Sequence, residues 1–589
     1  MRSVLAFLVA LSVLAFVRRS EAQERYALGV FHFNVQYVAG GMMGFSFLPN
    51  EALDLDNDAV EDLIVTESFA PVIDLYEKHP SWGVDIELQG YFLDVLAARH
   101  PAVLAKLRKL AKSGQIDVVS FHYSDQLFIG YPAEDWRRSQ ALTQATFTKH
   151  DVPLSRTVFC QEGQAGEALA ARMADLGYRN MVWPKNLWSF QHGDKPAEPL
   201  YAFGDIFLIQ GGKGASYQQG SVDVGMSWTF LDDGELLATG DLNPYLPDVF
   251  KHKPEEVKKY EDELLGLEAQ GYKIVTVDQY VDALKDRVPH APMPPLFDGT
   301  WQPNSTNGVL RWLGGKGIWE GERDNEVRTL GALGHRELVA AETAAKVAGI
   351  DARADLDAAW RLLALGQVTD ASGINPFRGE AEYGIAHCTE ALRIAREVIR
   401  RAKDAAGFGS ASIDPELGTM SSGSSLELRG EAVAALFEPS VEAGDRPVLA
   451  SWESLGAGHY RLELAIGPGT STAIVVGFPG ELEDELVITR ALDDDNLAKY
   501  RRSDFSFESF QLALPTGLVS LGKNRFLIKD QARVHLAAKI TRESGDIEMR
   551  DETLADGEGD TWVFHVVEGT AEQALAVARS VNVARRLSR

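Results

Sequence analysis

The stretch Arg156–Trp183, RTVFCQEGQAGEALAARMADLGYRNMVW, has the pattern of a strand, a helix and a second strand. Apolar residues over Arg156–Cys160 predict the first strand, and the spacing over Glu167–Leu176 predicts an amphipathic helix that Gly177 ends. A new apolar run over Asn180–Trp183 predicts the second strand. Strands joined by a helix usually lie parallel in one sheet, so this stretch indicates an α/β fold.

The same alternation continues on both sides, from Tyr26 to about Val288. Further strands are predicted at Tyr26–Phe33, Ile116–Phe121 and Lys273–Val277, and further helices at Ala102–Ser113 and Asp278–Asp286. So many strand–helix units in one domain predict a closed or nearly closed parallel barrel. In such a barrel the chemistry lies where strands end and loops begin.

Two changes of pattern follow the predicted barrel. The proline-rich stretch Pro289–Pro295 marks a boundary, after which helical patterns dominate. Those helices are expected at Leu330–Val347, Asp355–Leu365 and Glu380–Lys403, and later strands at Tyr460–Ile466, Thr472–Gly477, Arg533–Ile540 and Thr561–Val567. We therefore predict a barrel over residues 23–290, a helical bundle over 291–410 and a β-sandwich over 411–589.

The first 22 residues have the pattern of a signal peptide. Arg2 supplies the positive start, Val4–Val17 is apolar apart from Ser12, and Ala22 completes a cleavage site before Gln23. The apolar run is too short for a stable membrane span, although an uncleaved anchor is the alternative. We expect an exported protein, periplasmic or secreted, that is soluble after cleavage.

The composition narrows the classes of partner. The formal net charge is −27 and the isoelectric point is near 4.9, so phosphates of nucleic acids and anionic membranes would be repelled. Carbohydrate remains compatible with such a surface. Cys160 and Cys388 are the only cysteines, which permits one disulfide and gives no cysteine-rich zinc pattern.

Two carboxylates are candidates for catalysis. Glu162 follows a predicted strand in a glycine-containing turn, so its side chain could attack an anomeric carbon or bind a metal at the barrel mouth. Asp241, within Ala238–Tyr245 (ATGDLNPY), is the second candidate. Retaining glycosidases need two carboxyl groups about 5–5.5 Å apart. An ordinary loop glutamate and a turn aspartate are the alternative interpretations.

Other polar and aromatic residues could bind a substrate. His32, Asn34, Glu87 and His122 lie at the ends of predicted strands, and alternation places His32 and Asn34 on one face. Rings that could stack on sugars or simply pack the core are Tyr37, Trp183, Trp188 and Trp228, with Trp301, Trp312 and Trp319 after the boundary.

With these residues in view, the chain resembles the retaining α-glycosidases of glycoside hydrolase family 57 and, less closely, the family 38 α-mannosidases. The similar passages are Phe31–Tyr37 (FHFNVQY), Gly114–Gln126 (GQIDVVSFHYSDQ) and Phe159–Trp183 (FCQEGQAGEALAARMADLGYRNMVW). The resemblance implies a (β/α)7-type barrel followed by a helical bundle and β-domains. It also implies that Glu162 is the nucleophile, with Asp241 as the less secure acid/base.

The sequence differs from family 38 at positions that hold a zinc ion in that family. Its zinc ligands correspond here to His32, Asn34, Glu162 and Thr369, and neutral Asn and Thr are poor replacements for Asp and His. We therefore expect no metal and no other cofactor. The segment Ala359–Gly373 (AWRLLALGQVTDASG) looks like a family 38 passage and adds Asp370 as a substrate-positioning residue.

The leading hypothesis is a retaining glycoside hydrolase or transglycosylase that acts on α-linked sugars by double displacement. One alternative is a metal-dependent polysaccharide deacetylase, which usually needs a His-x-x-x-His spacing with a first-strand Asp-Asp that this chain lacks. The other is a carbohydrate-binding protein without catalysis. The altered motif around Phe33–Val35 leaves the identity of the sugar open.

Overall fold

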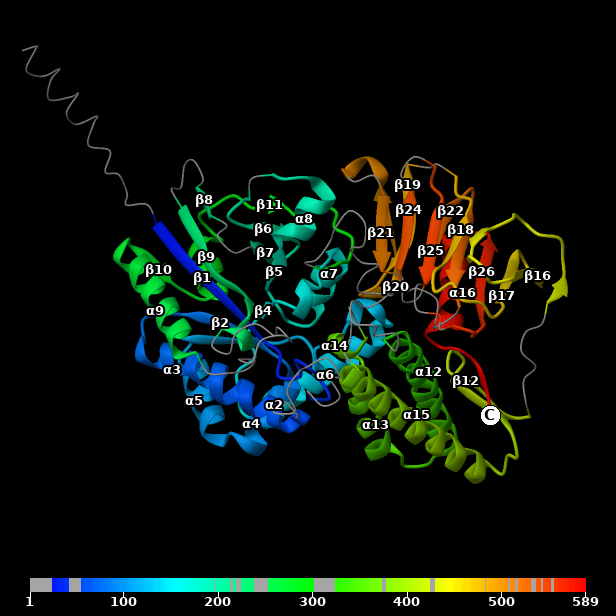
Figure 1. Ribbon diagram of the computed structural model, residues 1–589, viewed down its shortest axis with the longest axis horizontal. Helices are drawn as coiled ribbons and strands as arrows, with labels where there is room; N and C mark the ends of the chain where they lie inside the picture. The colour runs from blue at the N-terminus through cyan, green and yellow to red at the C-terminus, as the bar shows by residue number, and fades with distance from the viewer. Residues whose placement is uncertain are drawn as a thin grey trace, which may run out of the picture.

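The structure is a computed structural model. It describes residues 24–41, 55–195, 197–211, 216–218, 224–237, 253–300, 324–372, 378–423, 430–481, 484–506, 509–513, 517–530, 537–541, 544–551, 554 and 556–589. Parallel strands and helices form the N-terminal part, four helices follow, and antiparallel strands complete the chain (Figure 1). The predicted α/β class is confirmed.

Strand β1 (Glu24–Phe33) lies in the middle of the first sheet. Both β2 (Val84–Leu88) and β9 (Val224–Asp233) pair with it in parallel, and β3 (Ile116–Val119) continues in parallel beyond β2. The sheet is completed by β10 (Tyr272–Ile274), parallel to the start of β1, and by β8 (Ser216–Gln218), antiparallel to β9.

The second sheet contains the strand–helix–strand stretch from which the fold was predicted. Its parallel strands are β4 (Thr157–Val158), β5 (Asn180–Pro184) and β7 (Ile206–Gly211). Strand β6 (Tyr201–Phe203) runs antiparallel to β7, and β11 (Ala291–Pro292) pairs with β6. The described strands therefore form two neighbouring sheets, and a single closed barrel stays a prediction.

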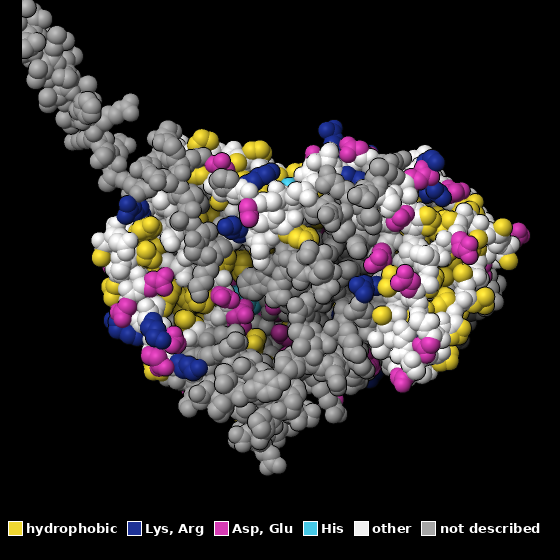
Figure 2. All heavy atoms as spheres, turned by 45° about the horizontal axis from the view of Figure 1, so that its top comes forward, with side chains coloured by type: hydrophobic (Ala, Val, Ile, Leu, Met, Phe, Trp, Pro, Cys, Tyr) yellow, Lys and Arg dark blue, Asp and Glu magenta, His cyan; other side chains and the backbone are white. Residues whose placement is uncertain are grey.

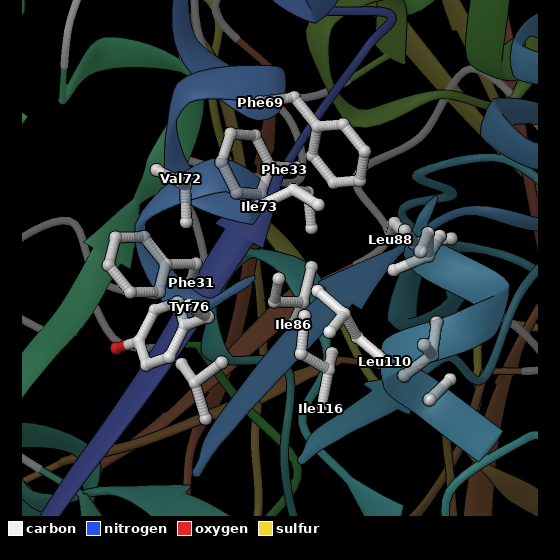
Figure 3. Packing of buried hydrophobic residues seen from close by; sticks show 14 of the residues in the cluster. Phe31, Phe33, Phe69, Val72, Ile73, Tyr76, Ile86, Leu88, Leu110 and Ile116 are labelled. Carbon is white, nitrogen blue, oxygen red and sulfur yellow. The ribbon is translucent and has the colours of Figure 1, made fainter. Parts of the chain in front are cut away.

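Alternation along β1 explains how the core and the site are separated. Phe31 and Phe33 point toward the outer helices, where they pack with Val72 and Ile73 (Figure 3). Leu28 and Val30 face a second apolar cluster shared by both sheets. Because successive residues of a strand face opposite sides, His32 continues the inner face at the carboxyl end of β1.

Helices cover the sheets, and their apolar faces follow the predicted periodicity. Around the first sheet lie α2 (Asn57–Leu63), α3 (Ala70–Lys78), α4 (Gly90–Arg99), α5 (Pro101–Lys112) and α9 (Pro254–Ala269), with a π-helical turn at Ile64–Phe69. The others are α6 (Ala133–Lys149), α7 (Glu167–Asp175), α8 (Lys185–His192) and α10 (Val277–Leu284).

The middle part consists of α12 (Asp324–Ala348), α13 (Arg353–Gly366), the short α14 (Thr369–Ser372) and α15 (Arg378–Ala406). Their shared core is rich in alanine, which lets long helices approach closely. Cys388 of α15 and Cys160 are both buried free thiols, so they do not form the disulfide that the sequence permits.

In the described residues, the C-terminal part contains two larger antiparallel sheets that share one apolar core. The larger sheet comprises β14 (Glu431–Ala432), β16 (Val448–Gly456), β17 (His459–Ile466), β26 (Asp560–Glu568), β23 (Arg525–Lys529), β22 (Leu518–Gly522), β19 (Glu485–Arg490) and β20 (Asp493–Arg501). The smaller comprises β15 (Ser440–Glu442), β18 (Ile474–Phe478), β25 (Ile547–Asp551), β24 (Ala537–Thr541) and β21 (Ser509–Ala513). Outside them lie α16 (Ala571–Asn582) and a small sheet of β12 (Ala411–Asp414), β13 (Thr419–Ser422) and β27 (Leu587–Ser588).

The predicted signal peptide lies outside the described residues. Within the described ranges, no helix combines the length and apolar character that crossing a membrane requires. Acidic and basic side chains are interspersed on the face of the molecule seen in Figure 2. The predicted domain limits stay predictions, although the pairing of β11 with β6 keeps residues 291–292 on the second sheet.

Candidate functional site

Buried polar side chains gather where β1 and β2 end. The register pairs His32 with Glu87, and Nδ1 of His32 contacts Oε2 of Glu87. Two residues further along each strand, Nε2 of Gln89 donates to Oδ1 of Asn34 over 2.8 Å. All four side chains are essentially inaccessible to solvent. Parallel pairing thus brings four residues from two distant segments onto one inner face.

The loop after β3 adds a second imidazole and another carboxylate. Nε2 of His122 lies 3.5 Å from Oε1 of Glu87, and Nδ1 of His122 lies 3.6 Å from Oδ1 of Asp125. Asp125 also accepts a hydrogen bond from Gln89. Asp125 was not predicted from the sequence, although its position three residues after His122 in the same loop was a usable signal.

Asp370 reaches the group from the helical part of the chain. It lies in α14, and its Oδ2 accepts a hydrogen bond of 2.8 Å from Nδ2 of Asn34. The backbone fixes this approach, because the amide of Thr369 donates to the carbonyl of Asp125 over 2.7 Å. The structure therefore joins Asp370 to the residues that the sequence placed at strand ends.

Two further carboxylates that were not predicted from the sequence lie at the end of β9: Asp233 is its last residue, and Glu235 lies in the turn that follows. Oε2 of Glu235 accepts a hydrogen bond of 3.2 Å from the backbone amide of Asn34. One carboxylate oxygen each from Asp233 and Glu235 and one ring nitrogen of His32 lie within 4.8 Å of one another. The signal was the acidic run after an apolar strand, the same argument that selected Glu162. Asp241, the predicted second carboxylate, lies outside the described residues.

Glu162 lies in the turn Gln161–Gly163, which begins three residues after the end of β4. Its φ of 56° and ψ of 19° fall in the left-handed region, which is unusual for a residue with a long side chain. Nearby, Gln164 donates from Nε2 to the carbonyl of Gln126 over 2.9 Å. This bond ties the Glu162 turn to the loop that carries Asp125, and the Glu162 side chain is half-buried.

Burial and mutual charge set the protonation of the group. Burial lowers the pKa of His32, but Glu87, together with Asp125 and Glu235, raises it well above its usual value. Burial lowers the pKa of His122 to about 4. Burial and neighbouring carboxylates raise the pKa of Glu235 and that of Asp125 well above their usual range. These shifts leave His122 neutral near pH 7, favour the cationic form of His32, and favour the protonated forms of Glu235 and Asp125.

Asp370 titrates between these extremes. Burial raises its pKa to about 6, and the hydrogen bond from Asn34 opposes that shift. Near neutral pH Asp370 therefore changes between a hydrogen-bond donor and a pure acceptor.

Solved structures share this architecture. An α-mannosidase from Enterococcus faecalis superposes with a TM-score of 0.59 at 9% identity, covering 96% of this chain and 89% of that chain. A family 38 glycosyl hydrolase from the same organism gives a TM-score of 0.55 at 10% identity, with the same coverage of both chains. The chain has the fold of a family 38 glycoside hydrolase. The predicted resemblance to the superfamily of families 57 and 38 is confirmed at the level of the fold.

Sequence comparison alone gives a shorter match. No family model matches the chain. Over 68 residues, which are 12% of this chain, it is 31% identical to Alpha-amylase 1 of Dictyoglomus thermophilum. The chain spans about a tenth of the length of that curated relative, since the match covers 10% of it.

The family 38 fold raises the question of zinc. Asn34 uses both ends of its amide, because Nδ2 donates to Asp370 and Oδ1 accepts from Gln89. This engaged amide and Thr369 do not fit the Asp and His of the family 38 zinc set. Donor groups that could hold another divalent cation are His32 with Glu87 and Asp125, and His32 with Asp233 and Glu235. The absence of a metal requirement stays a prediction.

The predicted aromatic residues Trp183 and Trp228 pack within apolar clusters. Trp183 is fully buried, with its ring centroid 4.7 Å from that of Trp188. Trp228 is also buried, and its Nε1 donates to the carbonyl of Gln210 over 3.0 Å, which links the two sheets. Both indoles pack apolar clusters, so a role in sugar binding stays a prediction. Trp312 lies outside the described residues.

Proposed function

We propose that this chain is an exported retaining glycoside hydrolase or transglycosylase that acts on α-linked oligo- or polysaccharides. The observation that carries the proposal is a set of buried polar atoms that have no hydrogen-bond partner among the described residues, where β1 and β2 end and in the loop after β3. They are Nε2 of His32, Oε1 of Glu87 and both ring nitrogens of His122. Buried polar groups are normally paired, so these atoms are suited to sugar hydroxyls.

The relatives support the same class of substrate. The solved structure is named an α-mannosidase and the curated relative an α-amylase, both names of enzymes for α-linked sugars. We infer that the two sheets are the halves of a seven-stranded barrel whose mouth holds the site. The pattern of residues 1–22 supports export to the periplasm or the medium.

Glu162 is the nucleophile in this proposal. Its carboxylate forms a bond to the anomeric carbon while the glycosidic bond breaks, and the acid/base residue gives its proton to the leaving oxygen. Water or a sugar hydroxyl then loses a proton to the same residue and displaces Glu162, which restores the original configuration. When water is the acceptor the reaction is hydrolysis, and when a sugar hydroxyl is the acceptor it is transglycosylation.

The acid/base has two candidates. Asp241 is the sequence-based candidate, whereas the described geometry favours Asp233. One oxygen of the Asp233 carboxylate lies within 4.8 Å of a carboxylate oxygen of Glu235 and a ring nitrogen of His32, and its side chain is half-buried. A positively charged neighbour, or one that donates a hydrogen bond, can stabilise the carboxylate that remains after proton transfer.

The metal-dependent deacetylase remains the second candidate, because His32, Asp233 and Glu235 bring donor atoms within 4.8 Å. A chelator separates it from the glycosidase, since the double displacement uses no metal.

Purified residues 23–589 should be assayed on aryl α-glycosides and α-linked polysaccharides, with and without chelator. We expect turnover that resists chelation and falls at least about 10³-fold in Glu162→Gln, because the nucleophile is lost. Asp233→Asn should cost about 10²–10⁴-fold on substrates with poor leaving groups, and Asp241→Asn much less. Acetate release that stops with chelator would contradict the proposal, as would full activity in Glu162→Gln.

A further inference from the structure

The loop that carries His122 and Asp125 is joined to the segment that carries Asp370. Gln126 and Val368 form an antiparallel bridge. The amide of Leu127 donates to the carbonyl of Gln367 over 3.0 Å, and the amide of Thr369 donates to that of Asp125 over 2.7 Å. The N-terminal sheet and the helical part therefore meet through backbone hydrogen bonds at the edge of the site.

The side chain of Gln367 strengthens this junction. It is completely buried, and its Oε1 accepts a hydrogen bond of 2.7 Å from Nε2 of Gln126. Its own Nε2 donates over 2.7 Å to Oδ2 of Asp135 in α6. One end must accept and the other must donate, so the amide has a single orientation. A glutamate here would place two carboxylates together.

A buried ion pair anchors the far end of this amide. Oδ1 of Asp135 lies 2.5 Å from Nδ1 of His335 in α12, and Nε2 of His335 lies 3.0 Å from the carbonyl of Val583 after α16. Both neighbours of the ring are acceptors, so His335 carries a proton on each nitrogen. A continuous chain of hydrogen bonds thus links the site loop to the C-terminal part.

We infer that Gln367 is a positioning residue for the active site. Through Gln126 it sets the place of Asp125, and through its own backbone it sets the place of Asp370. The ion pair Asp135–His335 holds the side-chain amide of Gln367 in its orientation. Gln367 itself does not touch the reacting atoms. The inference rests on the proposed function for its kinetic readout, but its geometric content can be measured separately.

A double-mutant cycle tests the inference on the full chain. Gln367→Met and Gln126→Met each remove the connecting hydrogen bond at similar volume. We expect each to lower kcat by about 10-fold or more, because small misplacements of catalytic groups are costly. The double variant should lose little more than the more affected single variant, since both changes break one connection. Losses that multiply would overturn the inference.

Val398→Ala on α15 is the matched control, because it removes buried volume from the helical core away from the site. It should lower Tm while kcat stays unchanged. If Gln367→Met behaves in the same way, the residue is only structural and the inference is wrong.

Crystal structures of the wild type and Gln367→Met provide a readout that does not depend on turnover. We expect Asp125 and Asp370 to move by about 1 Å in the variant, a displacement large enough to matter for catalysis. Unchanged positions would overturn the inference. If no substrate is turned over but the residues move, the proposed function fails while the positioning role stands.

Discussion

Glu162 combines an unusual backbone conformation with a candidate catalytic side chain. Left-handed conformations of residues other than glycine cost about 1–3 kcal/mol, and they concentrate at functional sites. Here the strained residue lies four positions after the end of β4, and Gly163 continues the turn with a φ of 54°. The conformation is an observation independent of the resemblance that selected Glu162, and both lead to the same residue.

Two carboxylates at the starts of β2 and β3 each have one buried oxygen without a hydrogen-bond partner among the described residues. Asp85 of β2 and Asp117 of β3 are register partners, and burial raises the pKa of Asp117 to about 6. Burial and the neighbouring Asp117 raise the pKa of Asp85 well above its usual range. These carboxylates lie at the starts of strands whose far ends carry the site, so they affect stability separately from catalysis.

Asp117 should make stability depend on pH. Its folded pKa lies above the usual 3.8, so its stabilising contribution is complete below about pH 4 and is lost as pH rises through 6. Asp117→Asn should remove that loss and raise the free energy of unfolding at pH 8 by about 2 kcal/mol. Urea unfolding between pH 4 and pH 8 measures this. Parallel pH profiles for both proteins would contradict it.

At the scale of elements, much of the fold follows from local pattern. The helix predicted at Glu167–Leu176 is α7 (Glu167–Asp175), and the strand predicted at Tyr26–Phe33 is β1 (Glu24–Phe33). Their periodicity and glycine ends are local properties of the chain. The pairing of β11 with β6 depends on contacts between distant residues, which periodicity does not contain.

The candidate site was also predictable only where local sequence pattern identifies its residues. His32, Asn34, Glu87 and His122 were found because polar residues at strand ends are visible in the sequence. Asp233 was missed, because only the parallel pairing of β9 with β1 brings it to His32. Side-chain contacts between elements that are distant in the sequence can be predicted only after the order of the strands in the sheet is known.

Gly234 shows how an element boundary supports the site. A Cβ atom at this position would lie 2.8 Å from the Phe33 ring and 3.0 Å from the carbonyl of His32. Gly234→Ala should therefore displace the turn that carries Asp233 and Glu235, lower activity about 10-fold and cost about 1–3 kcal/mol of stability. Kinetics and thermal unfolding measure both effects.

Gly266→Ala in α9 is the control for that substitution, because an added Cβ meets no atom within 4 Å. It should leave activity unchanged and stabilise the helix by up to about 1 kcal/mol. An active, fully stable Gly234→Ala protein would show that the turn does not depend on close packing against β1.

At the scale of the molecule, the C-terminal strands contact helices of the N-terminal part. Asp495 in β20 accepts from Nη1 of Arg137 in α6 over 3.0 Å and also contacts Arg172 in α7 and Arg579 in α16. The amide of Ala133 donates to Oδ2 of Asp494 over 2.9 Å. The C-terminal sheets therefore brace the helices that follow the two site loops.

This bracing predicts cooperative unfolding. Asp495→Ala leaves three guanidinium groups without their shared carboxylate, so it should lower the unfolding temperature of the whole chain by about 2–4 °C. Scanning calorimetry should show one transition that moves as a unit. Two transitions would contradict it if only the transition of the C-terminal strands shifted in temperature, because the parts would then unfold independently.

In the proposed mechanism, Glu162 forms a covalent bond with the sugar. The most direct measurement is mass spectrometry of the protein after reaction with 5-fluoro α-glycosyl fluorides, which slow the breakdown of a glycosyl–enzyme intermediate. We expect one added glycosyl group on the peptide that contains Glu162, and none in Glu162→Gln. A turning-over enzyme that stays unlabelled and releases product of inverted configuration, or one labelled at another carboxylate, would contradict it.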